Sequence, residues 1–265
     1  MNSPLPTFRS LLPTSLLALT LSVGLAACGR VDTPTPGTYR AFVKLRGGEV
    51  PFELQVSAQQ GQTVMGVLHD GEVRPLTNLQ MKDGALDAQL PDGAGMLHAT
   101  IGPQDLQGEV RFTDHLGAPQ TLPFTADRRQ TYQFIADAST DNADVSGYWQ
   151  LEAISPQHFS APVTVQLQQR FDAVDGQLRL PDGNMITLLG QVHGDDLYLS
   201  ALGQGRALLF KGKVNQHGEL QGELWTNLSN AQPWVAKRVV DDQVEMSAQG
   251  EPVRQVTLPW ALPTQ

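Results

Sequence analysis

Four short motifs occur twice in this chain, in the same order and about 110 residues apart. Ordered matches at a nearly constant offset indicate an internal duplication. The first set is GTYR at 37–40, PFEL at 51–54, DLQGEV at 105–110 and PFTADR at 123–128. The second set is GYWQ at 147–150, PVTV at 162–165, ELQGEL at 219–224 and PWVAKR at 233–238. The sequence therefore predicts two related modules, and it leaves open whether they are separate domains or interlock as one.

The repeat also predicts the domain boundaries. The first copy should span 37–136 and the second 146–240, which divides most of the 265 residues into two units of ordinary domain size. The stretch 137–145 is polar, acidic and without apolar periodicity, so it is interpreted as a linker or a long exposed loop. The segment 241–265 contains one more apolar run, from Val256 to Leu262, and is predicted to be a C-terminal strand or tail.

Within each copy the local pattern is that of β-strands. Phe52, Leu54 and Val56 alternate with polar residues, as do Val163, Val165 and Leu167, and a period of two places one face on a core and the other in water. Asp-Gly pairs, which favour tight hairpin turns, recur between the strands. They stand at 70–71, 83–84, 92–93, 175–176 and 182–183. We therefore predict an all-β fold with six to eight short antiparallel strands per copy.

The pattern leaves open whether each module is a β-sandwich or a β-barrel. The opening Gly-x-Tyr/Trp motif and the closing Pro-aromatic-x-Ala-x-Arg motif are expected to mark the first and last strands of each copy. No uninterrupted helical period is present in any window of about twelve residues.

The N-terminus carries an export signal. Arg9 precedes an apolar stretch from Leu11 to Ala27, which is too short and too interrupted for a span of about 20 residues. The sequence Leu-Ala-Ala-Cys-Gly at 25–29 resembles the lipobox of bacterial lipoproteins. The resemblance implies that residues 1–27 are a signal peptide and that the thiol of Cys28 is acylated. Residues 28–36 then form a short tether.

Acylation of Cys28 predicts a membrane anchor without a spanning helix, because each buried methylene adds about 0.8 kcal/mol of membrane affinity. By resemblance to Gram-negative lipoproteins, Gly29 rather than Asp after the cysteine implies sorting to the outer membrane, facing the periplasm. Cys28 is the only cysteine in the chain, so an intramolecular disulfide and a multi-thiolate metal site are both excluded.

The first copy is similar to the β-rich N-terminal module that precedes the thioredoxin domain in secreted TlpA-like thiol–disulfide reductases. The residues that carry this resemblance are 37–41, 47–54, 70–72, Gly108 and 123–126, within about 90 residues. Those reductases require a Cys-x-x-Cys pair, and no cysteine follows Cys28. The resemblance implies only a β module outside the cytoplasm, and the redox activity of those reductases cannot be carried over to this chain.

Charge and motif spacing limit the function. A net charge of −9 argues against a nucleic-acid partner. The six histidines form no close pair, and the spacings of serine hydrolases, zinc proteases and phosphate-binding loops are missing, so no metal, cofactor or catalytic residue is predicted. Glu109 and Glu223 occupy equivalent places in the two copies, but both are interpreted as outward-facing polar strand residues.

All four tryptophans, including Trp260 near the C-terminus, lie in the second half of the chain. Trp149, Trp225 and Trp234 are candidates for a pocket that takes an apolar ligand, although large aromatics also commonly fill the ends of β cores. The sequence favours a non-catalytic envelope lipoprotein that serves as a binding or interaction module. The alternative is a carrier for a lipid or other apolar molecule in the second module, and the third is a glycan-acting enzyme using Glu109 or Glu223.

Overall fold

The computed structural model describes residues 31–69, 71–137, 141–152, 163–180, 183–227 and 230–239. The predicted signal peptide, Cys28, Gly29 and the C-terminal segment with Trp260 lie outside the described residues. No helix long and apolar enough to cross a membrane occurs in the part of the chain that is described.

The prediction of an all-β fold is confirmed. The strands of the first module are β1 (Gly37–Leu45), β2 (Gly48–Gln59), β3 (Gln62–His69), β4 (Glu72–Pro75), β5 (Thr77–Lys82), β6 (Ala85–Leu90), β7 (Gly95–Ile101), β8 (Asp105–Thr113) and β9 (Pro119–Asp127). Those of the second module are β10 (Gly147–Glu152), β11 (Val163–Arg170), β12 (Ala173–Arg179), β13 (Met185–His193), β14 (Asp196–Gly203), β15 (Arg206–Val214), β16 (Leu220–Thr226) and β17 (Gln232–Val239). The opening and closing motifs lie in the first and last strands of each module, as expected.

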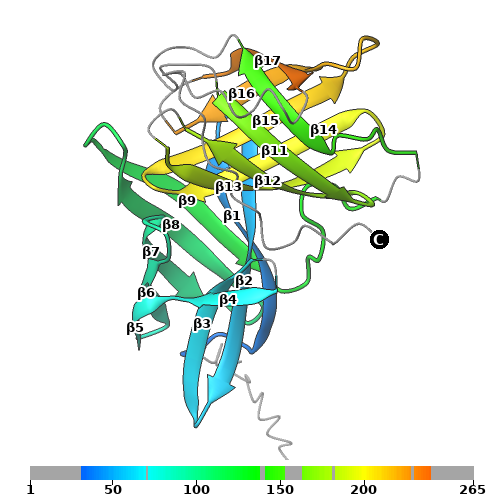
Figure 1. Ribbon diagram of the computed structural model, residues 1–265. Coiled ribbons are helices and arrows are strands. Elements are labelled where there is room, and N and C mark those ends of the chain that lie inside the picture. Colours follow the sequence, from blue (N-terminus) through cyan, green and yellow to red (C-terminus); the bar gives the residue numbers. More distant parts are fainter. Residues whose placement is uncertain are drawn as a thin grey trace, which may run out of the picture. The chain divides into compact units, whose positions relative to one another are not determined.

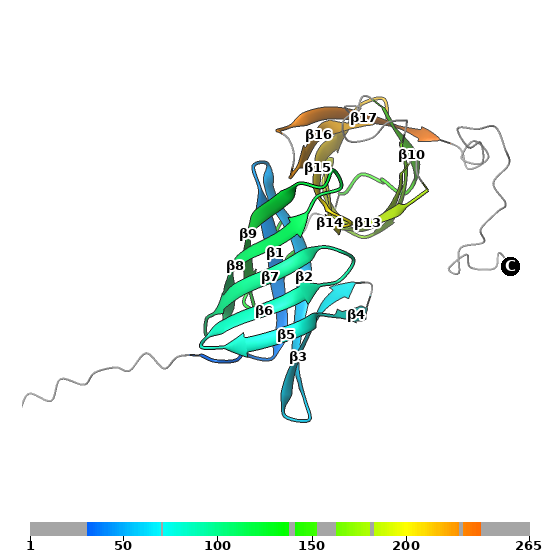
Figure 2. The ribbon, with the colours of Figure 1, turned by 90° about the vertical axis from the view of Figure 1, so that its left-hand side faces the viewer.

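The second module is a closed barrel in which each strand pairs antiparallel with its neighbour in sequence and β10 pairs with β17 (Figure 2). Alternate residues point inward, so that Val163, Val165 and Leu167 of β11 are buried in the barrel core. The same alternation runs through β10, β12, β16 and β17, whereas β13, β14 and β15 contain runs of three or four buried residues. This module is therefore a barrel and not a sandwich, the two forms that the sequence pattern did not separate.

The first module is a nearly closed sheet with the order β4-β3-β2-β1-β9-β8-β7-β6-β5 (Figure 1). Its two edge strands, β4 and β5, are consecutive in the chain and are separated only by Leu76. Pro75 lacks the N–H needed to continue a ladder, and Asn78 adopts a left-handed φ of 53° where the β5–β6 register shifts. One strand of the meander is thus split in two, and the sheet has nine strands where six to eight were predicted.

The repeated motifs make the same contacts in both modules. The Tyr39 hydroxyl donates to the Thr35 carbonyl at 2.7 Å, and the Trp149 indole N–H donates to the Val145 carbonyl at 2.8 Å. Each aromatic residue thus closes the entry to its first strand. In the closing motifs, the guanidinium groups of Arg128 and Arg238 each donate to the carbonyl just before the first strand.

The Asp-Gly turns are confirmed in part. Asp83-Gly84 and Asp92-Gly93 have positive φ at both residues, as a type I′ hairpin requires. Asp175-Gly176 was wrongly predicted as a turn, because both residues lie inside β12. Gly176 is needed there for space: a Cβ atom would come within 2.9 Å of the Leu167 side chain.

The region between the modules is tied to the second module. Gln191 on β13 accepts from the backbone N–H groups of Phe134 and Ile135 at 3.0 and 2.9 Å. The Ala143 N–H donates to the Gly194 carbonyl at 2.9 Å. Although residues 137–145 were interpreted as a linker or exposed loop, backbone and side-chain hydrogen bonds hold its described part at Ala143 and the segment just before it.

Candidate functional site

The outer wall of the barrel is partly apolar, and the first module covers it. Ala207 and Leu209 on β15 are 0% and 1% exposed and belong to the buried cluster of the first module, not to that of the barrel. Leu202 and Trp225 pack against the same cluster. Both modules lie within one compact unit that begins at Val31. The barrel wall therefore completes the core of the split first module.

Polar contacts lock this interface at two places. The Lys211 ammonium donates to the Gly47 carbonyl at 2.6 Å, and Trp225 lies so close to Gly47 that a Cβ atom there would meet the indole ring at 2.2 Å. At the β14–β15 turn, the Gln204 N–H donates to the Asp92 carbonyl at 2.8 Å. The contact fits two hairpin turns, one from each module, against each other.

His115 lies at the same turn contact. Burial, followed by the positive charge of Arg206, lowers the pKa of His115 below its usual range. Gly205 packs directly on this loop, since a Cβ atom there would lie 2.8 Å from the His115 backbone nitrogen. Protonation of His115 is thus disfavoured by the contact between the modules.

A cleft of about 370 Å³ opens between the two modules, within the size range of small-molecule sites. Its walls are the inner face of the first module and the outer face of β13 and β14. The first module contributes Pro51, Phe52, Val67, Arg74, Leu90, Pro91, Asp92 and Ala94. The barrel contributes Met185, Ile186, Thr187, Leu189, Ser200, Ala201, Leu202, Gly203 and Gln204. Apolar side chains outnumber polar ones in the lining, which nevertheless exposes a substantial polar surface.

Two polar features of the cleft stand out. Arg74 and Asp92 form an ion pair at 2.5 Å with side chains 39% and 53% exposed, so they mark the edge that faces solvent. Ser200, in contrast, is 2% exposed and lines the cleft. Its hydroxyl makes no hydrogen bond to a described residue, but it is not one of the fully enclosed side-chain atoms without a partner. A serine hydroxyl at such a position can donate to, or accept from, a molecule in the cleft.

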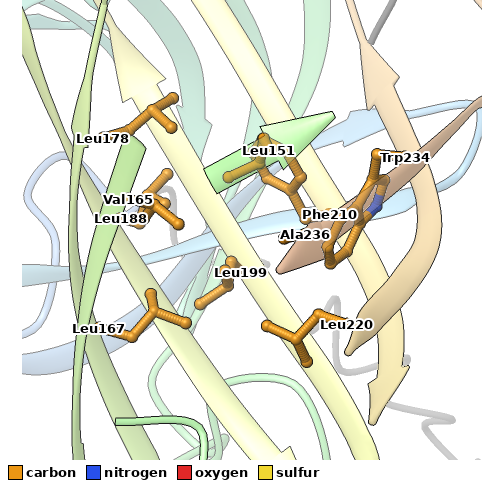
Figure 3. Close-up of a pocket in the computed structure, with 10 residues that line it drawn as sticks. All are labelled: Leu151, Val165, Leu167, Leu178, Leu188, Leu199, Phe210, Leu220, Trp234 and Ala236. Atoms are coloured by element: carbon orange, nitrogen blue, oxygen red, sulfur yellow. The ribbon is translucent and has the colours of Figure 1, made fainter. Parts of the chain in front are cut away.

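The tryptophans chosen from the sequence do not line this cleft. Trp149 is 0% exposed with its indole N–H hydrogen-bonded, and Trp225 packs at the module contact. Trp234 lines a small cavity in the barrel interior with nine other residues (Figure 3). That cavity measures about 10 Å³, roughly the space of one water molecule, so the barrel is filled where the carrier hypothesis needs room. Ligand binding by these tryptophans stays a prediction.

Glu109 and Glu223 are not brought together. Glu109 pairs with Arg111 on its own strand in the first module, and Glu223 lies opposite Lys211 and Pro233 on the barrel. Within the described ranges no group of three or more metal-binding side chains occurs.

A signal for the buried outer wall was present in the sequence. Ala207, Leu208, Leu209 and Phe210 form an unbroken apolar run, and all four are buried. A strand that is buried on both faces has such a run in place of alternation. This run, together with Leu199 to Leu202 on β14, distinguishes the covered side of the barrel from its solvated side.

No family model matches the chain, and no curated protein matches it either.

Proposed function

We propose that this protein is a lipid-anchored, non-catalytic binding protein of the cell envelope that holds a small, mainly apolar ligand in the cleft between its two modules. Cys28 carries the anchor, and the protein faces the periplasm from the outer membrane. The two modules arose by duplication, which accounts for the matching contacts of Tyr39 and Trp149 and of Arg128 and Arg238.

The observation that carries the proposal is the cleft itself. Its volume of about 370 Å³ and the predominance of apolar side chains in its lining suit a small molecule that is mainly hydrophobic, whereas the barrel interior offers only about 10 Å³. The proposed ligand site therefore lies at the contact between the modules, and not inside the second module, where the sequence suggested a carrier site. This position differs from the interior of a single barrel, because both modules are needed to form the walls.

Metabolic labelling with palmitate tests the anchor. The wild-type protein is expected to incorporate label, and Cys28→Ala is expected to lose it, since Cys28 is the only thiol in the chain. Equal labelling of the two proteins would refute the anchor at this residue.

Analysis of co-extracted small molecules tests the cleft. Met185 lines it and is 43% exposed, whereas Met96 is 40% exposed and does not line it. Met185→Trp should fill the cleft and Met96→Trp should not. Mass spectrometry of organic extracts of the purified proteins should show an apolar molecule with wild type and Met96→Trp and at least several-fold less with Met185→Trp. The same amount in all three would contradict the proposal.

A further inference from the structure

We propose that the ligand of the cleft is a single hydrocarbon chain that carries one uncharged oxygen group, an alcohol or an acyl ester or amide carbonyl, and that this oxygen is hydrogen-bonded to Ser200. The inference rests on the proposed binding function of the cleft and adds the class of ligand and the residue that recognises its polar group.

Among the polar residues that line the cleft, Ser200 is the one whose side chain makes no hydrogen bond to a described residue. It lies on the outer face of β14, opposite Leu189 of β13 and Leu209 of β15. Its neighbours in these registers are apolar, its hydroxyl has no partner among the described residues, and only 2% of the residue is exposed. The hydroxyl is not one of the fully enclosed side-chain atoms without a partner, and Ser200 lines the cleft, so a molecule in the cleft can reach it. A serine hydroxyl can both donate and accept. A ligand oxygen that reaches this point satisfies it.

The oxygen group has to be uncharged. The cation in the cleft lining is Arg74, and it is already paired with Asp92 at the solvent edge. A carboxylate or phosphate at Ser200 would be a buried anion without a counter-charge, and an ammonium group would be a buried cation without one. A hydroxyl or carbonyl meets neither penalty.

The rest of the lining indicates the character and the length of the ligand's hydrocarbon chain. Phe52, Val67, Leu90, Leu189 and Leu202 line the cleft with apolar surface. A volume of about 370 Å³ corresponds to about a dozen water volumes at roughly 30 Å³ each. A linear chain of about ten to twelve carbons fills it, and each methylene buried should raise the affinity about fourfold until the cleft is full.

Photo-crosslinking in outer-membrane preparations that contain the full-length lipidated protein tests the proposal. The probes are a dodecanol and a dodecanoate analogue, each with a diazirine in the chain, and the labelled peptides are identified by mass spectrometry. We expect the dodecanol analogue to label peptides of β2, β13 and β14, competed by unlabelled dodecanol. The dodecanoate analogue at pH 8 should label them at least fivefold less.

Ser200→Ala tests the contact itself. Loss of one hydrogen bond should weaken competition by dodecanol about fivefold. Ser57→Ala is the matched control, because Ser57 lies on β2 outside the cleft lining and should leave competition unchanged. Ser200→Ala removes an unpartnered group, so the fold is retained, and an unchanged melting temperature verifies this.

The possible outcomes distinguish failure of the ligand class from failure of the proposed binding function. Competition by dodecanol that is equally strong in Ser200→Ala and wild type would overturn the role of Ser200. Equal labelling by the dodecanoate and dodecanol analogues would overturn the uncharged ligand class. In both cases the proposed binding function would stand. Failure of both probes to label any cleft peptide would overturn the proposed function as well.

Discussion

Replacement of Phe171 by glycine is expected to stabilise the protein, although it removes a large aromatic side chain. Phe171 lies in the turn between β11 and β12, its side chain is 94% exposed, and its backbone is left-handed with φ of 61°. A left-handed conformation costs an L-residue roughly 1–2 kcal/mol, and glycine avoids this cost. The first module has Gln60 and Gly61, both at positive φ, between the corresponding strands β2 and β3.

Two smaller terms act against the substitution. Glycine loses roughly 0.5–1 kcal/mol more conformational free energy on folding than an ordinary residue. Burial of a whole phenylalanine side chain contributes about 1.5–3 kcal/mol, and Phe171 is only 6% buried by its 94% exposure, so the ring contributes about 0.2 kcal/mol at most. The net expectation for Phe171→Gly is a gain of about 0.5 kcal/mol, equivalent to a melting temperature about 1–2 °C higher.

The change in the free energy of unfolding is measured by urea unfolding, with tryptophan fluorescence as the probe. The change in melting temperature is measured by differential scanning calorimetry. Leu116→Gly is the matched control: Leu116 is also exposed, at 70%, but its φ is negative, so the same substitution should destabilise by about 0.5–1 kcal/mol. If Phe171→Gly lowers stability as much as Leu116→Gly does, the reasoning from backbone strain is refuted. A gain would show that this exposed aromatic residue is not retained for folding.

Three further predictions concern the cores and the contact between the modules. Trp149→Phe removes the buried indole hydrogen bond and should destabilise the protein by about 1–2 kcal/mol in urea unfolding. Gly222→Ala should cost more than about 2 kcal/mol in the same assay, because its Cβ atom would lie 1.9 Å from the Lys211 carbonyl oxygen in the β15–β16 ladder. The third concerns pH: because burial and Arg206 lower the pKa of His115 in the folded state, the unfolded chain binds more protons as the pH falls through about 6.5. Melting temperatures should therefore fall between pH 7 and pH 5, and less so in His115→Gln.

The strands and their inward faces were accessible from the sequence because they depend on local patterns. The alternation in β2 and β11 predicted which residues are buried, and Asp83-Gly84 and Asp92-Gly93 predicted hairpins. The turn predicted at Asp175-Gly176 was wrong, because the sequence does not distinguish a glycine that makes room for neighbouring side chains from a glycine in a turn. The split of one strand at Pro75 was also missed, since proline alone does not show whether its neighbours stay paired.

The candidate site could not be found in the same way. Trp149, Trp225 and Trp234 were selected because aromatic side chains often line ligand pockets, but Trp149 and Trp234 fill the barrel and Trp225 seals the module contact. Ser200 gave no signal, because a serine at an outward position of a strand is ordinarily hydrated. It becomes notable only when another module covers it.

By itself the sequence determined that the chain is built of strands, that its two halves carry the same motifs, and which side chains point into each module. Only the tertiary structure decided that the first module is what covers the apolar outer face of β14 and β15, and therefore where a cleft remains. The physical reason is distance along the chain: a contact such as that between Lys211 and Gly47 joins residues 164 positions apart. It depends on the shape of two finished surfaces, which no local period encodes.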